Sequence, residues 1–135
     1  MIDFYIDTIE DLREIAGTDE DITYSEKKKV TAPQWMKYAA KRGLKIRSEQ
    51  PESNRCCLPT GLRRANQIKN GETLSLSTLK RMKSFAARHG AQADWKTPEG
   101  KNAQALLVWG IPYSKDGLNK FKMWVDKKIA YLEND

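Results

Sequence analysis

Apolar residues recur every three or four positions along most of the chain, which is the period of an amphipathic helix. No segment alternates apolar and polar residues over the length that a strand needs. The sequence therefore predicts an all-α protein, a compact bundle of five or six short helices. The expected helices lie at about 2–16, 31–48, 60–70, 77–89, 102–109 and 118–132.

Capping and turn residues mark several ends of these helices. Thr31 and Gln34 have the spacing of a capping box, so a helix is expected to begin there. Gly71 is expected to end the helix before it, and Ser75 or Ser77 is expected to cap the next one. The two helices on either side of Gly71 predict a helix-turn-helix-like pair at about 60–89, although this turn is longer than in the standard motif.

Charge divides the chain into two parts. Residues 1–26 contain nine acidic residues and one basic residue, a net charge of −8, whereas residues 27–93 contain sixteen basic and three acidic residues, a net charge of +13. We therefore expect an acidic N-terminal arm with one amphipathic helix at 1–30 and a basic helical domain at 31–135. The opposite charges predict that the arm folds back on the basic domain, the alternative being that it packs as one more helix with its acids facing water.

The basic residues gather on helical faces that lie outside the predicted core. Such faces attract phosphate polyanions, and Arg, Ser and Thr on a helix can also contact base edges. The alternative is a solvated surface that keeps the protein soluble, because many ordinary bundles also have a basic outer face. The interpretation that we prefer is a nucleic-acid-binding face, with DNA favoured over RNA. Its predicted residues are Lys37, Lys41, Lys45, Arg63, Arg64, Lys80, Arg81, Ser84 and Arg88.

Signatures of catalysis and of metal binding are nearly absent from the sequence. It contains no P-loop, no G-x-G-x-x-G and no H-E-x-x-H. The single histidine, His89, is expected to pack at the end of a helix. Cys56 and Cys57 are adjacent, so the strained geometry argues against a bond between them, and with one histidine they make a poor zinc site. We therefore expect a non-enzymatic protein with no catalytic residue, metal ion or cofactor.

Four tryptophans are candidates for stacking on nucleic-acid bases. Trp35, Trp109 and Trp124 lie in apolar helical faces, so we expect them in the core. Trp95 lies in a polar loop and is the only one that we expect to be exposed.

The sequence predicts neither a membrane span nor a signal peptide. The longest uncharged apolar run, near 103–111, is much shorter than a span requires. The N-terminus is acidic where a signal peptide needs basic residues. We expect a cytosolic protein with no membrane partner.

Three motifs occur in one order along the basic part of the chain. Residues 64–71 read Arg-Ala-x-x-Ile-x-x-Gly, residues 81–89 read Arg-Met-x-Ser-Phe-x-Ala-Arg-His, and residues 106–110 read Leu-Leu-x-Trp-Gly. Together they resemble a small helical module that recurs in tailed-phage and prophage proteins. The resemblance spans about 37–125, leaves out the acidic arm, and departs from the module at 110–113, where Gly-Ile-Pro-Tyr replaces a glycine-rich turn.

The resemblance implies a phage origin, with the host cytoplasm or the virion as the location, and it does not imply one activity. Two functions besides nucleic-acid binding therefore stay open. The protein is then either a structural or assembly protein of the virion, or a small effector that binds a host protein.

Overall fold

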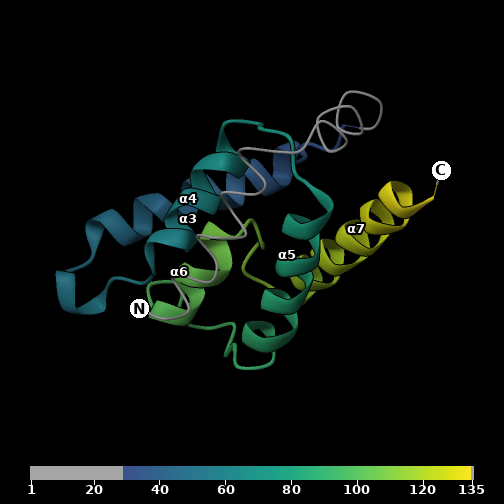
Figure 1. The fold of residues 1–135 in the computed structure, drawn as a ribbon. Coiled ribbons are helices and arrows are strands. Elements are labelled where there is room, and N and C mark those ends of the chain that lie inside the picture. The colour runs from purple at the N-terminus through teal and green to yellow at the C-terminus, as the bar shows by residue number, and fades with distance from the viewer. Residues whose placement is uncertain (1–28, 135) are drawn as a thin grey trace.

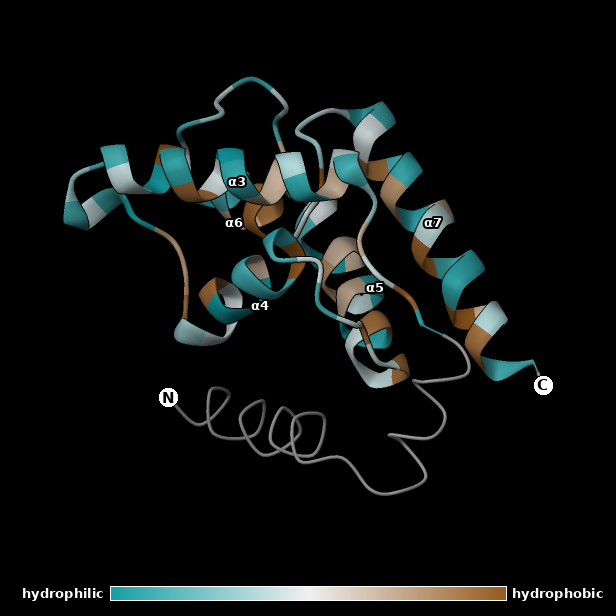
Figure 2. Ribbon diagram, turned by 90° about the horizontal axis from the view of Figure 1, so that it is seen from above, coloured by the Kyte–Doolittle hydropathy of each residue, from teal (hydrophilic) through white to brown (hydrophobic). Residues whose placement is uncertain are grey.

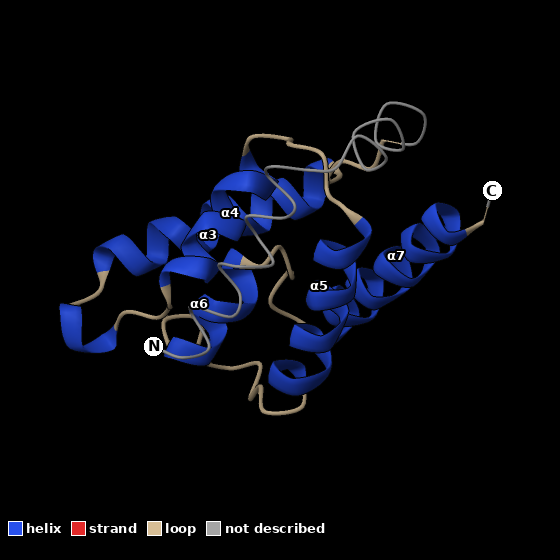
Figure 3. Ribbon diagram, in the orientation of Figure 1, coloured by secondary structure: helices blue, strands red, loops and turns tan. Residues whose placement is uncertain are grey.

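A computed structural model describes residues 29–134, and every regular element within this range is helical (Figures 1 and 3). The all-α fold class is thus confirmed. Residues 1–28 and 135 lie outside the described range, and with them the predicted helix 2–16 and the fold-back of the acidic arm. The elements are α3 (Gln34–Glu49), a 3-10 turn η1 (Glu52–Asn54), α4 (Pro59–Lys69), α5 (Leu76–Gly90), α6 (Lys101–Val108) and α7 (Lys115–Glu133).

The helices form two packing groups that α6 connects. Helix α3 packs against α6 and α4, whereas α5 packs against α7, as their positions in Figure 1 show. Helix α6 also contacts both α4 and α5. Apolar positions recur along α7 with helical spacing (Figure 2), and the side of the helix that carries them is buried. The largest fully buried side chains include Met36, Ile68, Leu79, Leu106, Phe121 and Val125.

The helix-turn-helix-like pair is not confirmed, because the main partners of α4 are α3 and α6 and the main partner of α5 is α7. The connection between α4 and α5 explains this arrangement. Leu74 is 1% exposed, and its N–H donates to the carbonyl of Val30 at 2.8 Å. This bond holds the connection against the segment before α3, so the two helices leave it toward different partners.

Two helix ends follow the signals in the sequence. The Ser75 hydroxyl caps α5 by accepting a hydrogen bond from the N–H of Thr78 at 3.2 Å. Gly71 follows the end of α4 with a φ of 70°, a left-handed conformation that glycine adopts without the steric cost of a side chain.

The prediction of a capping box at Thr31 is wrong. Helix α3 begins at Gln34, and Pro33 occupies the N-cap position with no side-chain cap. The residue before a proline disfavours helical backbone angles, so Pro33 itself delays the start of the helix. Pro33 is extended, with a ψ of 166°.

Helices α3 and α6 approach each other closely at Gly43. A Cβ atom at this position would lie 2.6 Å from the backbone nitrogen of Val108 and 2.7 Å from the Cβ of Leu107. Both distances are shorter than van der Waals contact, so the absence of a side chain at Gly43 sets the spacing of the two helices.

Asp94 organises the loop between α5 and α6. Its carboxylate accepts hydrogen bonds from the Tyr113 hydroxyl at 2.6 Å and from the N–H groups of Lys96 and Thr97. These bonds, that of Tyr113 first, lower the pKa of Asp94 well below its ordinary value of 3.8. The ionised Asp94 carboxylate therefore stabilises the fold at neutral pH, and this stabilisation decreases as the pH falls below 3.8. Trp95, expected to be exposed, is instead half-buried and packs on Tyr113 with ring centroids 5.2 Å apart.

No helix within residues 29–134 has both the length and the apolar character that crossing a membrane would require.

Candidate nucleic-acid interface

The residues that the structure describes are strongly basic. Residues 29–134 contain 21 Lys and Arg against 8 Asp and Glu, a net charge of +13. Most of these basic residues lie within the helices that Figure 1 labels.

Four of the predicted binding residues line one concave surface on α5, which we call the basic groove. Lys80, Ser84 and Arg88 are exposed, and Arg81 is half-buried. Their spacing of three or four residues places them on one side of the helix. The groove has a volume of about 360 Å³ and is lined by Thr60, Ser77, Lys80, Arg81, Ser84, Arg88 and Trp109.

Lys80 also pairs with an acidic residue of α7. Its Nζ lies 3.6 Å from a carboxylate oxygen of Glu133, and the two side chains are 55% and 49% exposed. Exposed ion pairs contribute at most about 1 kcal/mol to stability. Lys80 can therefore exchange this partner for a phosphate group at little cost.

Arg64, predicted to be part of the binding face, is buried and structural. It is 3% exposed and donates to the side-chain oxygens of Gln67 and Thr78, the second at 3.4 Å. Its guanidinium also lies 5.8 Å from the centroid of the Trp109 ring. The reason is its position on the same face of α4 as the buried Thr60, four residues earlier, because residues four apart in a helix share a face.

The other predicted residues lie outside the basic groove. Arg63 is exposed on α4, and Lys41 and Lys45 are exposed on α3, but none of them lines it. Lys37 is half-buried beside the turn after α4, where a Cβ at Gly71 would lie 3.1 Å from its Nζ. The structure therefore brings together the predicted residues of α5 and leaves those of α3 apart.

A second concave surface, the aromatic cavity, adjoins the basic groove. Its volume is about 450 Å³, within the range of small-molecule sites. Three aromatic side chains in its wall form a stack, since the Phe85 ring lies 4.3 Å from both the His89 ring and the Trp109 ring. The cavity is lined by Cys56, Cys57, Leu58, Thr60, Gly61, Phe85, Arg88, His89, Ala105 and Trp109.

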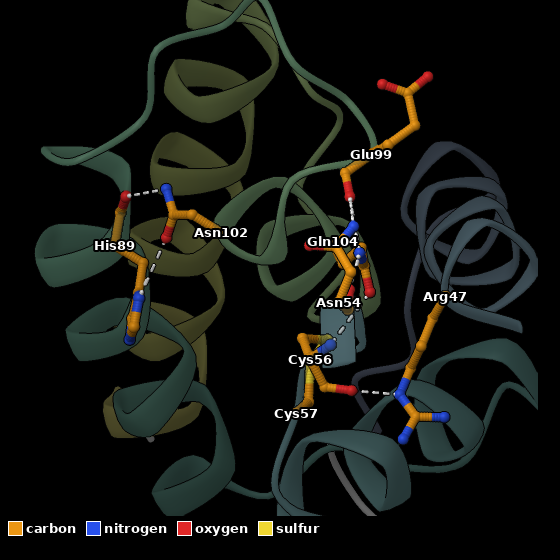
Figure 4. The surroundings of a disulfide bond; sticks show 8 residues. All are labelled: Arg47, Asn54, Cys56, Cys57, His89, Glu99, Asn102 and Gln104. Atoms are coloured by element: carbon orange, nitrogen blue, oxygen red, sulfur yellow. Dashed lines mark hydrogen bonds between the residues drawn. A yellow bond between two sulfur atoms is a disulfide. The ribbon is translucent and has the colours of Figure 1, made fainter. Parts of the chain in front are cut away.

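His89 packs at the end of α5, where the sequence predicted it. Its ring stacks on Phe85, and its Nδ1 lies 3.3 Å from the side-chain oxygen of Asn102 (Figure 4). The Asn102 amide in turn donates to the His89 carbonyl at 3.3 Å. Both contacts fix the ring as part of the cavity wall.

Cys56 and Cys57 are joined by a disulfide, so the expectation that they stay unbonded is wrong. The backbone of Cys56 is held from both sides: its carbonyl accepts from Nε of Arg47, and its N–H donates to Gln104 at 3.1 Å (Figure 4). Both cysteines line the aromatic cavity. Arg47 and Gln104 therefore fix the backbone of the disulfide in this wall.

Gln104 supports this wall from within the core. It is 0% exposed, and its amide donates to the carbonyls of Asn54 and Glu99 at 2.8 and 2.7 Å, as Figure 4 shows. The buried glutamine therefore joins α6 to two loops that lie far from each other in sequence. The sequence signal for this role was a polar residue within the apolar run 103–108.

Sequence reasoning missed Thr60 and Trp109 as lining residues. Both line the basic groove and the aromatic cavity, together with Arg88. Thr60 follows the proline that begins α4, which was a usable signal for a helix N-terminus. Trp109 was assigned to the core, and it does pack there while its remaining surface faces the cavities.

The lining of both cavities contains no carboxylate from the described residues. Within residues 29–134, no group of three or more His, Cys, Asp or Glu side chains is suited to hold a metal ion. The chemistry that these surfaces offer is cationic, hydroxyl and aromatic. No protein family, curated protein or solved structure matches this chain.

Proposed function

We propose that this protein binds nucleic acid through the basic groove and performs no catalytic step. One observation carries the proposal, namely that the groove combines three cations with two serine hydroxyls. The cations are Lys80, Arg81 and Arg88, and the described residues that line the groove include no Asp or Glu, although Lys80 also pairs with Glu133 beside it. Phosphate oxygens accept hydrogen bonds from all of these groups.

The anchoring of α5 supports the proposal. Its opposite face is buried, with Leu79, Met82 and Phe85 among the core residues, and it packs along α7. The groove residues therefore project from a helix that is fixed in place. A fixed array of cations loses less conformational entropy on binding a polyanion than the same cations on a loop.

A phage origin, and a place in the host cytoplasm or the virion, belong to the proposal as well. They rest on the motifs at 64–71, 81–89 and 106–110. The motif at 81–89 contains Arg81, Ser84 and Arg88, which the fold places in the groove. An assembly or effector role would use the same cations to bind an acidic protein, which the following experiment separates from nucleic-acid binding.

The test is a fluorescence anisotropy titration of labelled oligonucleotides, as single strand and as duplex, at several salt concentrations. We expect binding at low salt that weakens by orders of magnitude when the salt rises a few-fold, because bound phosphates release counterions. A salt-independent affinity contradicts the electrostatic interface. No binding at low salt contradicts the proposal itself and favours a protein partner.

Substituting Arg81 and Arg88 together by Ala should weaken binding by about 10- to 100-fold and lower the salt slope by about 2, one for each lost phosphate contact. The charge-matched control is Lys115→Ala with Lys127→Ala, two exposed lysines of α7 outside the groove. The control should lose much less affinity. Both proteins should keep the wild-type circular dichroism spectrum, and equal losses of affinity would show that the groove is not the interface.

A further inference from the structure

The N-terminus of α4 lies at the boundary of the two cavities, and its own first turn supplies no negative charge. The helix begins at Pro59, has no side-chain cap, and carries no acidic residue in its first turn. Pro59 has no N–H, and the N–H groups of Gly61 and Leu62 donate to the Leu58 carbonyl, so Thr60 supplies the remaining amide of the first turn. The helix dipole makes this end positive. Such an end favours an anion.

Thr60, in the first turn of α4, adds a second and independent observation. The residue is 5% exposed, and its hydroxyl makes no hydrogen bond with any described residue. A buried hydroxyl without a partner destabilises the fold. Thr60 lines both the basic groove and the aromatic cavity, so a ligand at their junction can supply the missing partner.

The junction of the two cavities is formed by Thr60, Arg88 and Trp109, which are common to both. Arg88 makes no ion pair or hydrogen bond within the described residues and is exposed. A guanidinium and a helix N-terminus side by side bind phosphate oxygens well. The guanidinium is a planar hydrogen-bond donor, and the helix N-terminus contributes an amide N–H and the positive end of the helix dipole.

We infer that one phosphodiester of a single-stranded nucleic acid binds at this junction, with its neighbouring base in the aromatic cavity. The inference rests on the proposed function and names its substrate class. The phosphate accepts hydrogen bonds from the Thr60 hydroxyl and first-turn amide and pairs with Arg88. The strand continues along the basic groove toward Ser77 and Lys80.

Two observations favour a single strand over a duplex. The aromatic cavity, at about 450 Å³, has room for a base, and its wall includes Phe85, His89 and Trp109. Only an unstacked base can enter such a cavity, and single strands present their bases without the cost of opening a duplex. In addition, α4 and α5 do not pair as a helix-turn-helix, the arrangement that would place α5 in a major groove.

The test compares Thr60→Val with Thr60→Ser in the full-length protein. The probe is a labelled oligothymidylate of about 12 nucleotides with a 5′-hydroxyl, so that all of its phosphates are diesters. Valine keeps the volume of threonine and removes the hydroxyl, and we expect a loss of affinity of about 10-fold. Serine keeps the hydroxyl and should bind within about 3-fold of wild type. Thr73→Val, at an exposed threonine outside both cavities, is the matched control.

Two further readouts separate a ligand contact from a structural role. Because the Thr60 hydroxyl has no partner in the fold, Thr60→Val should leave the melting temperature unchanged or raise it. Because the substitution removes no charge, the salt slope should stay at the wild-type value, whereas Arg88→Ala should lower it by about 1.

The outcomes distinguish the inference from the proposed function. If wild type binds the oligothymidylate and Thr60→Val binds it equally well, the phosphate site is overturned. If a duplex of the same length binds as tightly as the single strand, the single-strand assignment is overturned. If wild type binds neither, the proposed function fails and the inference fails with it.

Discussion

At the scale of single residues, Gln104 is a buried polar side chain that joins three segments of the chain. It is 0% exposed and satisfies the N–H of Cys56 and the carbonyls of Asn54 and Glu99. Substituting it by Met keeps the length of the side chain and leaves the Cys56 N–H and the Asn54 carbonyl without this partner, whereas the Glu99 carbonyl keeps its bond from the Asn54 amide. We expect Gln104→Met to lower the free energy of unfolding by about 3 kcal/mol, since each such group costs about 1–3 kcal/mol.

A urea titration followed by circular dichroism measures this change. Gln92→Met, at an exposed position in the loop after α5, is the control and should stay within about 0.5 kcal/mol of wild type. A stability of Gln104→Met equal to wild type would mean that water replaces the glutamine amide.

The place of the polar residues on the outer side of α5 was predictable from sequence, and the burial of Arg64 was not. On α5 the apolar positions occupy one face so completely that the basic residues can only lie opposite. On α4 the charge of Arg64 suggested an outward position, although it lies on the same face as Thr60 and Ile68. The long arginine side chain reaches polar groups and the Trp109 ring inside the fold, which a count of charges does not reveal.

At the scale of helices, the contact between α3 and α6 depends on Gly43. Gly43→Ala should lower the free energy of unfolding by about 2 kcal/mol, because the new Cβ would lie 2.6 Å from the Val108 backbone nitrogen. This value is the net loss of stability, after the gain of about 1 kcal/mol that alanine brings through its helix propensity.

Gly61→Ala on α4 is the matched substitution, since its nearest neighbours would lie 3.4 Å from the new Cβ, an ordinary contact. Thermal melting of the two variants should therefore move in opposite directions or leave Gly61→Ala at the wild-type value. A Gly43→Ala protein that melts at or above wild type would mean that α6 shifts without cost.

The positions of the helices were predictable, and their partners were not. Helical period is a property of neighbouring residues, so five of the expected helices appear within a few residues of their predicted bounds. Packing depends on contacts that link distant segments, such as the bond between Leu74 and Val30. No local pattern around Gly71 indicates that α4 and α5 would turn to different partners.

At the scale of the whole molecule, the acidic arm provides a test that follows from charge alone. If the arm competes with polyanions for the basic domain, Asp19→Asn, Glu20→Gln and Asp21→Asn together should tighten oligonucleotide binding about 3- to 10-fold at low salt. The gain should shrink as the salt concentration rises, because screening weakens the attraction between the two parts.

The same anisotropy titration measures this effect in the full-length chain. The control neutralises three acids of the helical domain, Glu49, Glu52 and Glu99, which changes the net charge by the same amount. An equal gain in both proteins would show that net charge acts without any competition by the arm.

Thr60 and Arg88 belong to different packing groups, and this has a consequence for the local opening of the fold. Thr60 belongs to α4, which packs with α3 and α6, whereas Arg88 belongs to α5, which packs with α7. Proteins open locally in cooperative units that follow such groups. If a phosphate binds both residues, as we infer, it links the two packing groups, because its contacts would be lost whenever the α5–α7 pair separates from the rest. Bound nucleic acid should therefore slow amide hydrogen exchange in α4 and α5 together, including at amides that the ligand never touches.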